Sequence, residues 1–186
     1  MSEYRELAAT ITAEVHAVLD KVDSVEVDRL VDELSGARRV FIFAVGRVML
    51  ALECLGKRLG HLQIDCQIVG AVTEKPIGPE DLLLIASGSG ESKLPAEITR
   101  IAKAKSARIG LITAADDSTI KRLSDFSLRM PCSTKTDPSC GIRSIQSMST
   151  LFDQCLHLLG DVIAIKLQER RGLSNEELWK YHANLE

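Results

Sequence analysis

The stretch DLLLIASGSGES, residues 81–92, sets an apolar run directly before a cluster of serines and glycines. A short continuous apolar run is typical of a strand that is buried on both faces, as the strands of parallel sheets are. The small residues that follow predict a tight loop at the end of this strand. A helix is expected after the loop, with Pro95 in its first turn, where a proline is tolerated. The stretch therefore indicates a strand–loop–helix unit.

The same alternation of strand and helix runs through the middle of the chain. Strands are predicted at residues 39–44, 63–70, 81–86, 107–113 and 126–131, and helices at 3–22, near 27–34, from about 145 to 171, and after Ser174. Alternating strands and helices form a parallel sheet that is covered on both faces. We therefore expect an α/β fold, a three-layer αβα sandwich with a five-stranded parallel sheet of the flavodoxin-like type. The expected organisation is a single domain over residues 1–186, with N-terminal helices (1–35) and C-terminal helices (145–186) packed on it.

The composition argues against several classes of protein. Of 186 residues, 45% are hydrophobic and 26% are charged, and the net charge of −3 gives no general attraction to nucleic acid or anionic lipid. No apolar run approaches the ~20 residues of a membrane-spanning helix. The 5 cysteines lack CxxC spacing, so neither a disulfide framework nor a zinc site is expected, and a reducing cytoplasm is the predicted location. We expect no nucleic-acid partner, no membrane partner and no metal.

The serine–glycine loop is a candidate anion site. In open parallel sheets, ligands bind beyond the carboxyl ends of the strands, and the N-terminus of the following helix offers unpaired N–H groups. Glycines allow the backbone to approach a ligand, and serine hydroxyls add donors without bulk. The predicted phosphate-binding residues are Ser87, Gly88, Ser89, Gly90, Glu91 and Ser92. The alternative is a plain turn with an N-cap, in which Glu91 only complements the helix dipole.

The loop also resembles the phosphate loop of sugar isomerase (SIS) domains. Four further stretches are similar to the 6-phospho-3-hexuloisomerase family: GR at 46–47, KRLGHL at 57–62, the segment at 69–92, and HANLE at 182–186. The resemblance implies a phosphorylated sugar as substrate, a homotetramer, and no metal or organic cofactor. The implied reaction interconverts D-arabino-hex-3-ulose 6-phosphate and fructose 6-phosphate, a step of the ribulose monophosphate route.

Moving a ketone from C3 to C2 passes through a 2,3-enediolate and needs a base and an oxyanion donor. His61, Asp153 and His182 are the catalytic candidates. His61 lies in RLGHL, Asp153 stands where the family has a glutamate that is proposed as the base, and His182 opens HANLE. The alternatives are a helix C-cap for His61, a solvated helix residue for Asp153 and a frayed chain end for His182.

The loop after the strand predicted at 39–44 departs from the family pattern. Arg47 is a candidate substrate ligand, with a surface salt bridge as its alternative, but Val48 and Met49 replace a serine and a glycine. The family's serine donates to the phosphate, and valine has no donor. Two other functions therefore stay open: a non-catalytic phosphosugar-binding protein, or an isomerase for a different phosphosugar.

Overall fold

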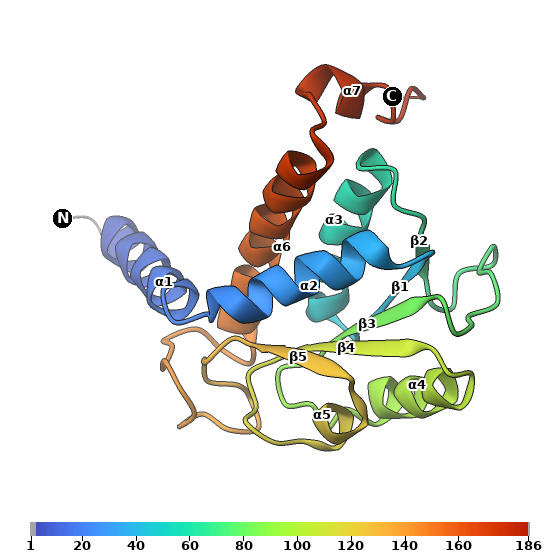
Figure 1. Ribbon diagram of the computed structural model, residues 1–186. Helices are drawn as coiled ribbons and strands as arrows, with labels where there is room; N and C mark the ends of the chain where they lie inside the picture. Colours follow the sequence, from blue (N-terminus) through green and yellow to red (C-terminus); the bar gives the residue numbers. More distant parts are fainter. Residues whose placement is uncertain (1–2, 186) are drawn as a thin grey trace.

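The structure is a computed structural model that describes residues 3–185, so the first two residues of the expected domain and the final glutamate of HANLE lie outside the described residues. Figure 1 shows a central sheet with helices on both sides. The elements are α1 (Glu3–Leu19), α2 (Ser24–Gly36), β1 (Val40–Phe43), α3 (Arg47–His61), β2 (Cys66–Ile68), β3 (Leu82–Ala86), α4 (Lys93–Ala104), β4 (Arg108–Thr113), α5 (Thr119–Leu123), β5 (Phe126–Arg129), α6 (Thr150–Arg171) and α7 (Asn175–Trp179).

The sheet has five parallel strands in the order β2-β1-β3-β4-β5. Adjacent residues of a strand point to opposite faces, and the core divides accordingly. Val40 and Ile42 pack into a cluster with residues of α1, α2, α3 and α6. Phe41, Leu83 and Ile85 pack on the other face with α4 and α5. The predicted three-layer sandwich with a five-stranded parallel sheet is confirmed.

The two largest differences from the predicted bounds are elements that are shorter in the structure. The strand expected at 63–70 comprises only Cys66–Ile68, which pairs with β1 alone at the edge of the sheet. The long helix expected from about 145 begins at Thr150. The segment from 132 to 149, between β5 and α6, is a loop with a single parallel bridge between Cys132 and Ile142. This loop lies at the carboxyl end of the sheet.

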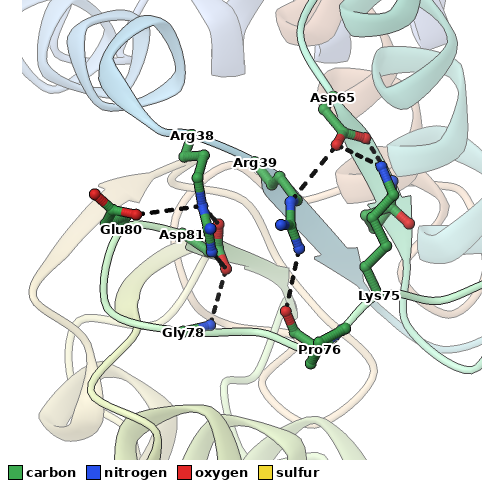
Figure 2. Close-up of polar contacts among 9 residues, drawn as sticks. Arg38, Arg39, Asp65, Lys75, Pro76, Gly78, Glu80 and Asp81 are labelled. Carbon is green, nitrogen blue, oxygen red and sulfur yellow. Dashed lines mark hydrogen bonds and ion pairs between the residues drawn. The ribbon is translucent and has the colours of Figure 1, made fainter.

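Ion pairs connect residues at the opposite end of the sheet, where the strands begin (Figure 2). Arg38, just before β1, donates from Nε and an Nη to the two carboxylate oxygens of Asp81, at 3.0 and 2.9 Å. The Asp81 side chain is fully buried and also accepts from the N–H of Gly78. Lys75 donates to Asp65 at 2.8 Å, ahead of β2. These contacts fix the segment between β2 and β3 at the amino ends of the strands, at the opposite end of the sheet from the serine–glycine loop.

Candidate active site

The serine–glycine loop joins β3 to the N-terminus of α4, and hydrogen bonds to its own hydroxyl groups stabilise it. The N–H of Gly90 donates to both the carbonyl and Oγ of Ser87 at 3.1 Å. The N–H of Glu91 donates to Oγ of Ser89 at 3.2 Å. Ser87 is only 4% exposed, and Ser92 is the N-cap residue of α4 without a capping bond from its side chain. The loop thus places serine hydroxyls at a helix N-terminus, a position where anions bind in proteins, and its role as a phosphate site stays a prediction.

Two glycines of the loop have packing reasons that the sequence does not reveal. A Cβ on Gly88 would lie 3.1 Å from Cγ2 of Thr134, so the loop after β5 rests directly on it. Gly90 has φ of +64°, the left-handed region that disfavours side chains. A Cβ there would also overlap Oγ of Ser118, which caps α5. The glycines therefore let two neighbouring segments close around the serine hydroxyls.

A cavity of about 260 Å³ lies over this loop at the carboxyl ends of the strands. That volume suits a ligand smaller than a typical drug molecule. One wall is the start of α3, a second is the serine–glycine loop, and a third is the loop after β5 together with the start of α6. The lining residues are Val45, Gly46, Arg47, Val48, Ala86, Ser87, Gly88, Ser89, Ser92, Thr134, Lys135, Thr136, Met148, Ser149 and Asp153.

The third wall was not predicted from the sequence. Thr134, Lys135, Thr136 and Ser149 line the cavity beside the predicted serines. The signal that was available is positional: the polar run STKT follows directly after β5 and Cys132. Since β5 is parallel to β3, its carboxyl end must meet the same edge of the sheet.

Arg47 and Asp153 meet in this cavity from two different helices. Arg47 is the first residue of α3, and its Nε donates to Oδ2 of Asp153, in the first turn of α6, at 3.1 Å. Asp153 is 7% exposed, and its Oδ1 is buried without a hydrogen-bond partner. Burial raises the pKa of Asp153 above its ordinary value, and Arg47 opposes this shift. A carboxylate that has a raised pKa and one oxygen without a hydrogen-bond partner has the properties of a general base.

A second cavity, of about 570 Å³, adjoins the same ion pair. It lies between α1, α3 and α6 and is mainly apolar, with Ile11, Leu50 and Leu158 among its lining residues. His157, one helical turn beyond Asp153, also lines it. The Arg47–Asp153 pair therefore lies between the polar cavity and this apolar one.

His61 and His182 lie together, but elsewhere in the subunit. His61 is the last residue of α3 and is 6% exposed, and its ring stacks on that of His182 with centroids 5.3 Å apart. Both line a third cavity of about 510 Å³ with Trp179. Nε2 of His61 is buried without a partner, and burial lowers its pKa, aided by the charges of Lys57 and Arg58. Burial and these charges therefore favour the neutral form of the imidazole.

The length of α3 separates the histidines from Asp153. Arg47 and His61 are its first and last residues, so 14 steps of about 1.5 Å place their backbones roughly 21 Å apart. The structure thus brings together Arg47, Ser87, Gly88, Ser89, Ser92 and Asp153 around one cavity. Within one subunit it does not bring His61 or His182 to them.

Glu91 and Met49 have local structural partners. Oε1 of Glu91 accepts from the N–H of Thr119 at 2.7 Å, at the start of α5, and this bond lowers the pKa of Glu91. Neither Glu91 nor Gly90 lines the 260 Å³ cavity. Sδ of Met49 accepts from the N–H of Ala44 at 3.2 Å, so Met49 fills the turn after β1. Val48 lines the cavity without offering a donor.

The chain belongs to the SIS domain family, whose model matches residues 33–158. Its curated relatives include the 3-hexulose-6-phosphate isomerase of Bacillus subtilis, which is 35% identical over 97% of this chain and 98% of that protein. The enzyme of the same name from Mycobacterium gastri is 35% identical over 93% of this chain and 86% of its own length. The predicted family and the predicted enzyme class, an isomerase, are confirmed.

Solved structures agree on the fold. A crystal structure of a Methanococcus jannaschii protein, from which a molecular function of 3-hexulose-6-phosphate isomerase was inferred, superposes with a TM-score of 0.83. It covers 97% of this chain and 99% of its own, at 23% sequence identity. Within residues 3–185, no helix is long and apolar enough to cross a membrane, and no group of three or more histidine, cysteine or acidic side chains is placed to hold a metal ion.

Proposed function

We propose that this chain is a phosphosugar isomerase that interconverts D-arabino-hex-3-ulose 6-phosphate and fructose 6-phosphate. The observation that carries the proposal is Asp153, a buried carboxylate of raised pKa on the wall of a cavity floored by serine hydroxyls and helix N–H groups. Relatives of that enzyme name at 35% identity support the same reaction. The chain works as a single domain in this proposal.

The phosphoryl group binds at the serine–glycine loop. Ser87 and Ser89 donate their hydroxyls, and the N-terminus of α4 offers N–H groups and a favourable dipole. Anchoring the phosphate fixes the sugar carbons along the wall that holds Arg47 and Asp153. This positioning converts the proton transfers into steps within one complex.

Asp153 then acts as the base. In the direction of fructose 6-phosphate, it removes the proton from C2, and the electron pair forms the C2–C3 double bond while the C3 carbonyl oxygen becomes an enediolate oxygen. The proton of the C2 hydroxyl passes to the oxygen on C3, and return of a proton to carbon C3 leaves the carbonyl at C2. The guanidinium of Arg47, 68% exposed in its side chain and already at the pocket, is placed to stabilise the oxyanion.

The two histidines enter through oligomerisation. His61 and His182 are too far from Asp153 of their own subunit, and a homo-oligomer, as a tetramer, allows a second copy to bring them to the pocket. The apolar cavity beside Asp153 and the exposed side chains of Leu50, Leu158 and Ile165 on α3 and α6 support burial of this face between copies. In that arrangement the neutral imidazole of His61 shuttles a proton between the enediolate oxygens.

The reduced state of the cysteines supports a location in the cytoplasm. All 5 are free thiols, and Cys132 and Cys155 are fully buried. The ribulose monophosphate route is the metabolic setting that fits this substrate pair. A coupled assay tests the reaction: ribulose 5-phosphate, formaldehyde and a hexulose-phosphate synthase are supplied, and fructose 6-phosphate is measured. Absence of fructose 6-phosphate with a folded protein would reject the proposed reaction.

The phosphate site is tested separately from turnover. Ser87→Ala combined with Ser89→Ala is expected to abolish phosphosugar binding in calorimetry and to leave the far-ultraviolet circular dichroism spectrum unchanged. Affinity equal to that of the unmodified protein would place the phosphate elsewhere.

Val48 favours one second candidate, a phosphosugar-binding protein without turnover. Val48 lines the cavity at the position where the family has a serine that donates to the phosphate, so one hydrogen bond to the phosphate is missing. Fructose 6-phosphate that binds in calorimetry without isomerising in the coupled assay would identify this function.

A further inference from the structure

The loop after β5 forms one wall of the 260 Å³ cavity, and packing and hydrogen bonds hold this loop in place. Thr134 is only 5% exposed and rests on Gly88 of the serine–glycine loop. Its Oγ1 lies 3.2 Å from Oγ1 of Thr136 and accepts from the N–H of Asp137 at 3.2 Å. The N–H of Lys135 faces Oγ of Ser149 at 3.4 Å, which links the loop to the start of α6. The position of Lys135 is thereby tied to the cavity.

The charges around the cavity single out Lys135. Arg47 and Lys135 are the two cationic side chains among its lining residues, and Arg47 is paired with Asp153. Lys135 makes no ion pair within the described part of the chain. The nearest acid in sequence, Asp137, uses its Oδ1 to accept from Ser139 and from the N–H of Cys140, and it forms no ion pair with Lys135. The ammonium of Lys135 is thus available to a ligand.

The chemistry of the expected ligand calls for such a charge. A phosphate monoester carries a charge of about −1.5 to −2 at neutral pH. The serine–glycine loop offers neutral donors only, because its hydroxyls and backbone N–H groups carry no charge. The start of α3 adds Val48, which has no donor. A charge-assisted bond from Lys135 would supply what these neutral groups lack.

We propose that Lys135 is a phosphate-binding residue whose ammonium pairs with the phosphoryl group of the substrate from the loop after β5. Thr134 and Ser149 hold its backbone in place. The inference rests on the proposed phosphosugar site and adds to it the charged partner of the phosphoryl group.

The test is calorimetric binding of two probes, inorganic phosphate and fructose 6-phosphate, to the full chain. Lys135→Met removes the charge and keeps an unbranched side chain that is one atom shorter. We expect it to weaken both probes roughly tenfold to a hundredfold, the loss typical of one hydrogen bond to a charged group. Lys135→Arg is expected to stay within a few-fold of the unmodified protein.

Lys105→Met is the matched control. Lys105 is an exposed lysine at the C-terminal end of α4, away from the cavity, and it makes no ion pair in residues 3–185. It loses the same charge, so unchanged binding there shows that net charge alone is not responsible. Equal urea midpoints for all variants exclude misfolding.

The outcomes separate this inference from the proposed reaction. Lys135→Met that binds both probes within twofold of the unmodified protein would overturn it, as would an equal loss in Lys105→Met. A protein that binds phosphate through Lys135 but produces no fructose 6-phosphate supports the inference and rejects only the reaction.

Discussion

Gly90→Ala tests how the serine–glycine loop is held. Gly90 has φ of +64°, and a Cβ there would overlap the Ser118 hydroxyl and lie 2.5 Å from the Ser118 Cβ. Ser118 is buried, and its Oγ accepts from the N–H of Lys121 at 3.1 Å as the N-cap of α5. The side chain of Ser118 cannot shift without breaking this cap. The substitution therefore strains the backbone and disturbs a neighbouring helix together.

The magnitude follows from three contributions. A non-glycine residue in the left-handed region costs about 1–2 kcal/mol. Loss of a serine cap costs about 1 kcal/mol, and forcing atoms into a filled space costs about 1–3 kcal/mol. We expect Gly90→Ala to lower the free energy of unfolding by about 3–6 kcal/mol, a large part of the ~5–15 kcal/mol of an ordinary domain.

Urea unfolding followed by circular dichroism at one protein concentration measures this loss. Gly36→Ala is the control, because Gly36 ends α2, is exposed and has no atom within 4 Å of an added Cβ. It is expected to be neutral or slightly stabilising. Adding Ser118→Gly to Gly90→Ala removes the overlap and should recover about 1–3 kcal/mol. A loss below about 1 kcal/mol for Gly90→Ala, or no recovery in the double variant, would refute the reasoning.

Two further predictions concern the buried titratable groups. Asp153→Asn is expected to remove isomerase activity in the coupled assay. It should also raise the free energy of unfolding at pH 7: the folded-state pKa of Asp153 is raised, so the charged form destabilises the fold above that pKa, and Arg47, mostly exposed, loses little when unpaired. The gain should shrink as the pH falls and Asp153 becomes protonated, and turnover at the unmodified rate would mean that another group is the base. His61 has a lowered folded-state pKa, so the unfolded chain binds the extra proton first, and stability should fall as the pH drops below about 6.5. Urea midpoints at pH 7.5 and 5.5 should therefore differ less in His61→Gln than in the unmodified protein, and equal differences would contradict the shift.

The sheet could be predicted because β1, β3 and β4 are short apolar runs that alternate with helical segments along the chain. The error at the start of α6 has a tertiary cause. The N–H of Ile145 donates at 2.7 Å, and the Ser144 hydroxyl at 2.6 Å, to the carboxylate of Glu14 on α1. These bonds hold the segment outside the helix, and Met148 takes φ of +60° just before it. A partner 130 residues away leaves no trace in the local pattern.

The serine–glycine loop could be predicted from local signals because its residues are contiguous, whereas Arg47 and Asp153 were predicted through the family resemblance. SGSGES lies between the end of β3 and the start of α4, so its position at the carboxyl end of the sheet follows from local signals alone. Lys135 and Thr134 reach the same cavity from a different strand end, and their approach depends on the absence of a Cβ at Gly88. The role of Glu91 at the start of α5 likewise depends on how that helix is docked.

The length of a helix separates the predicted catalytic residues into two groups. The family resemblance predicts roles for Arg47 and His61, and both lie on α3, but a helix of 15 residues keeps its ends roughly 20 Å apart. Residues of α3 pack against α6 and the sheet along the helix. The chain therefore carries two separate clusters, Arg47–Asp153 at one end of α3 and His61–His182 at the other. If both clusters serve one reaction, the reaction requires a second copy of the chain, and the geometry of α3 is the reason.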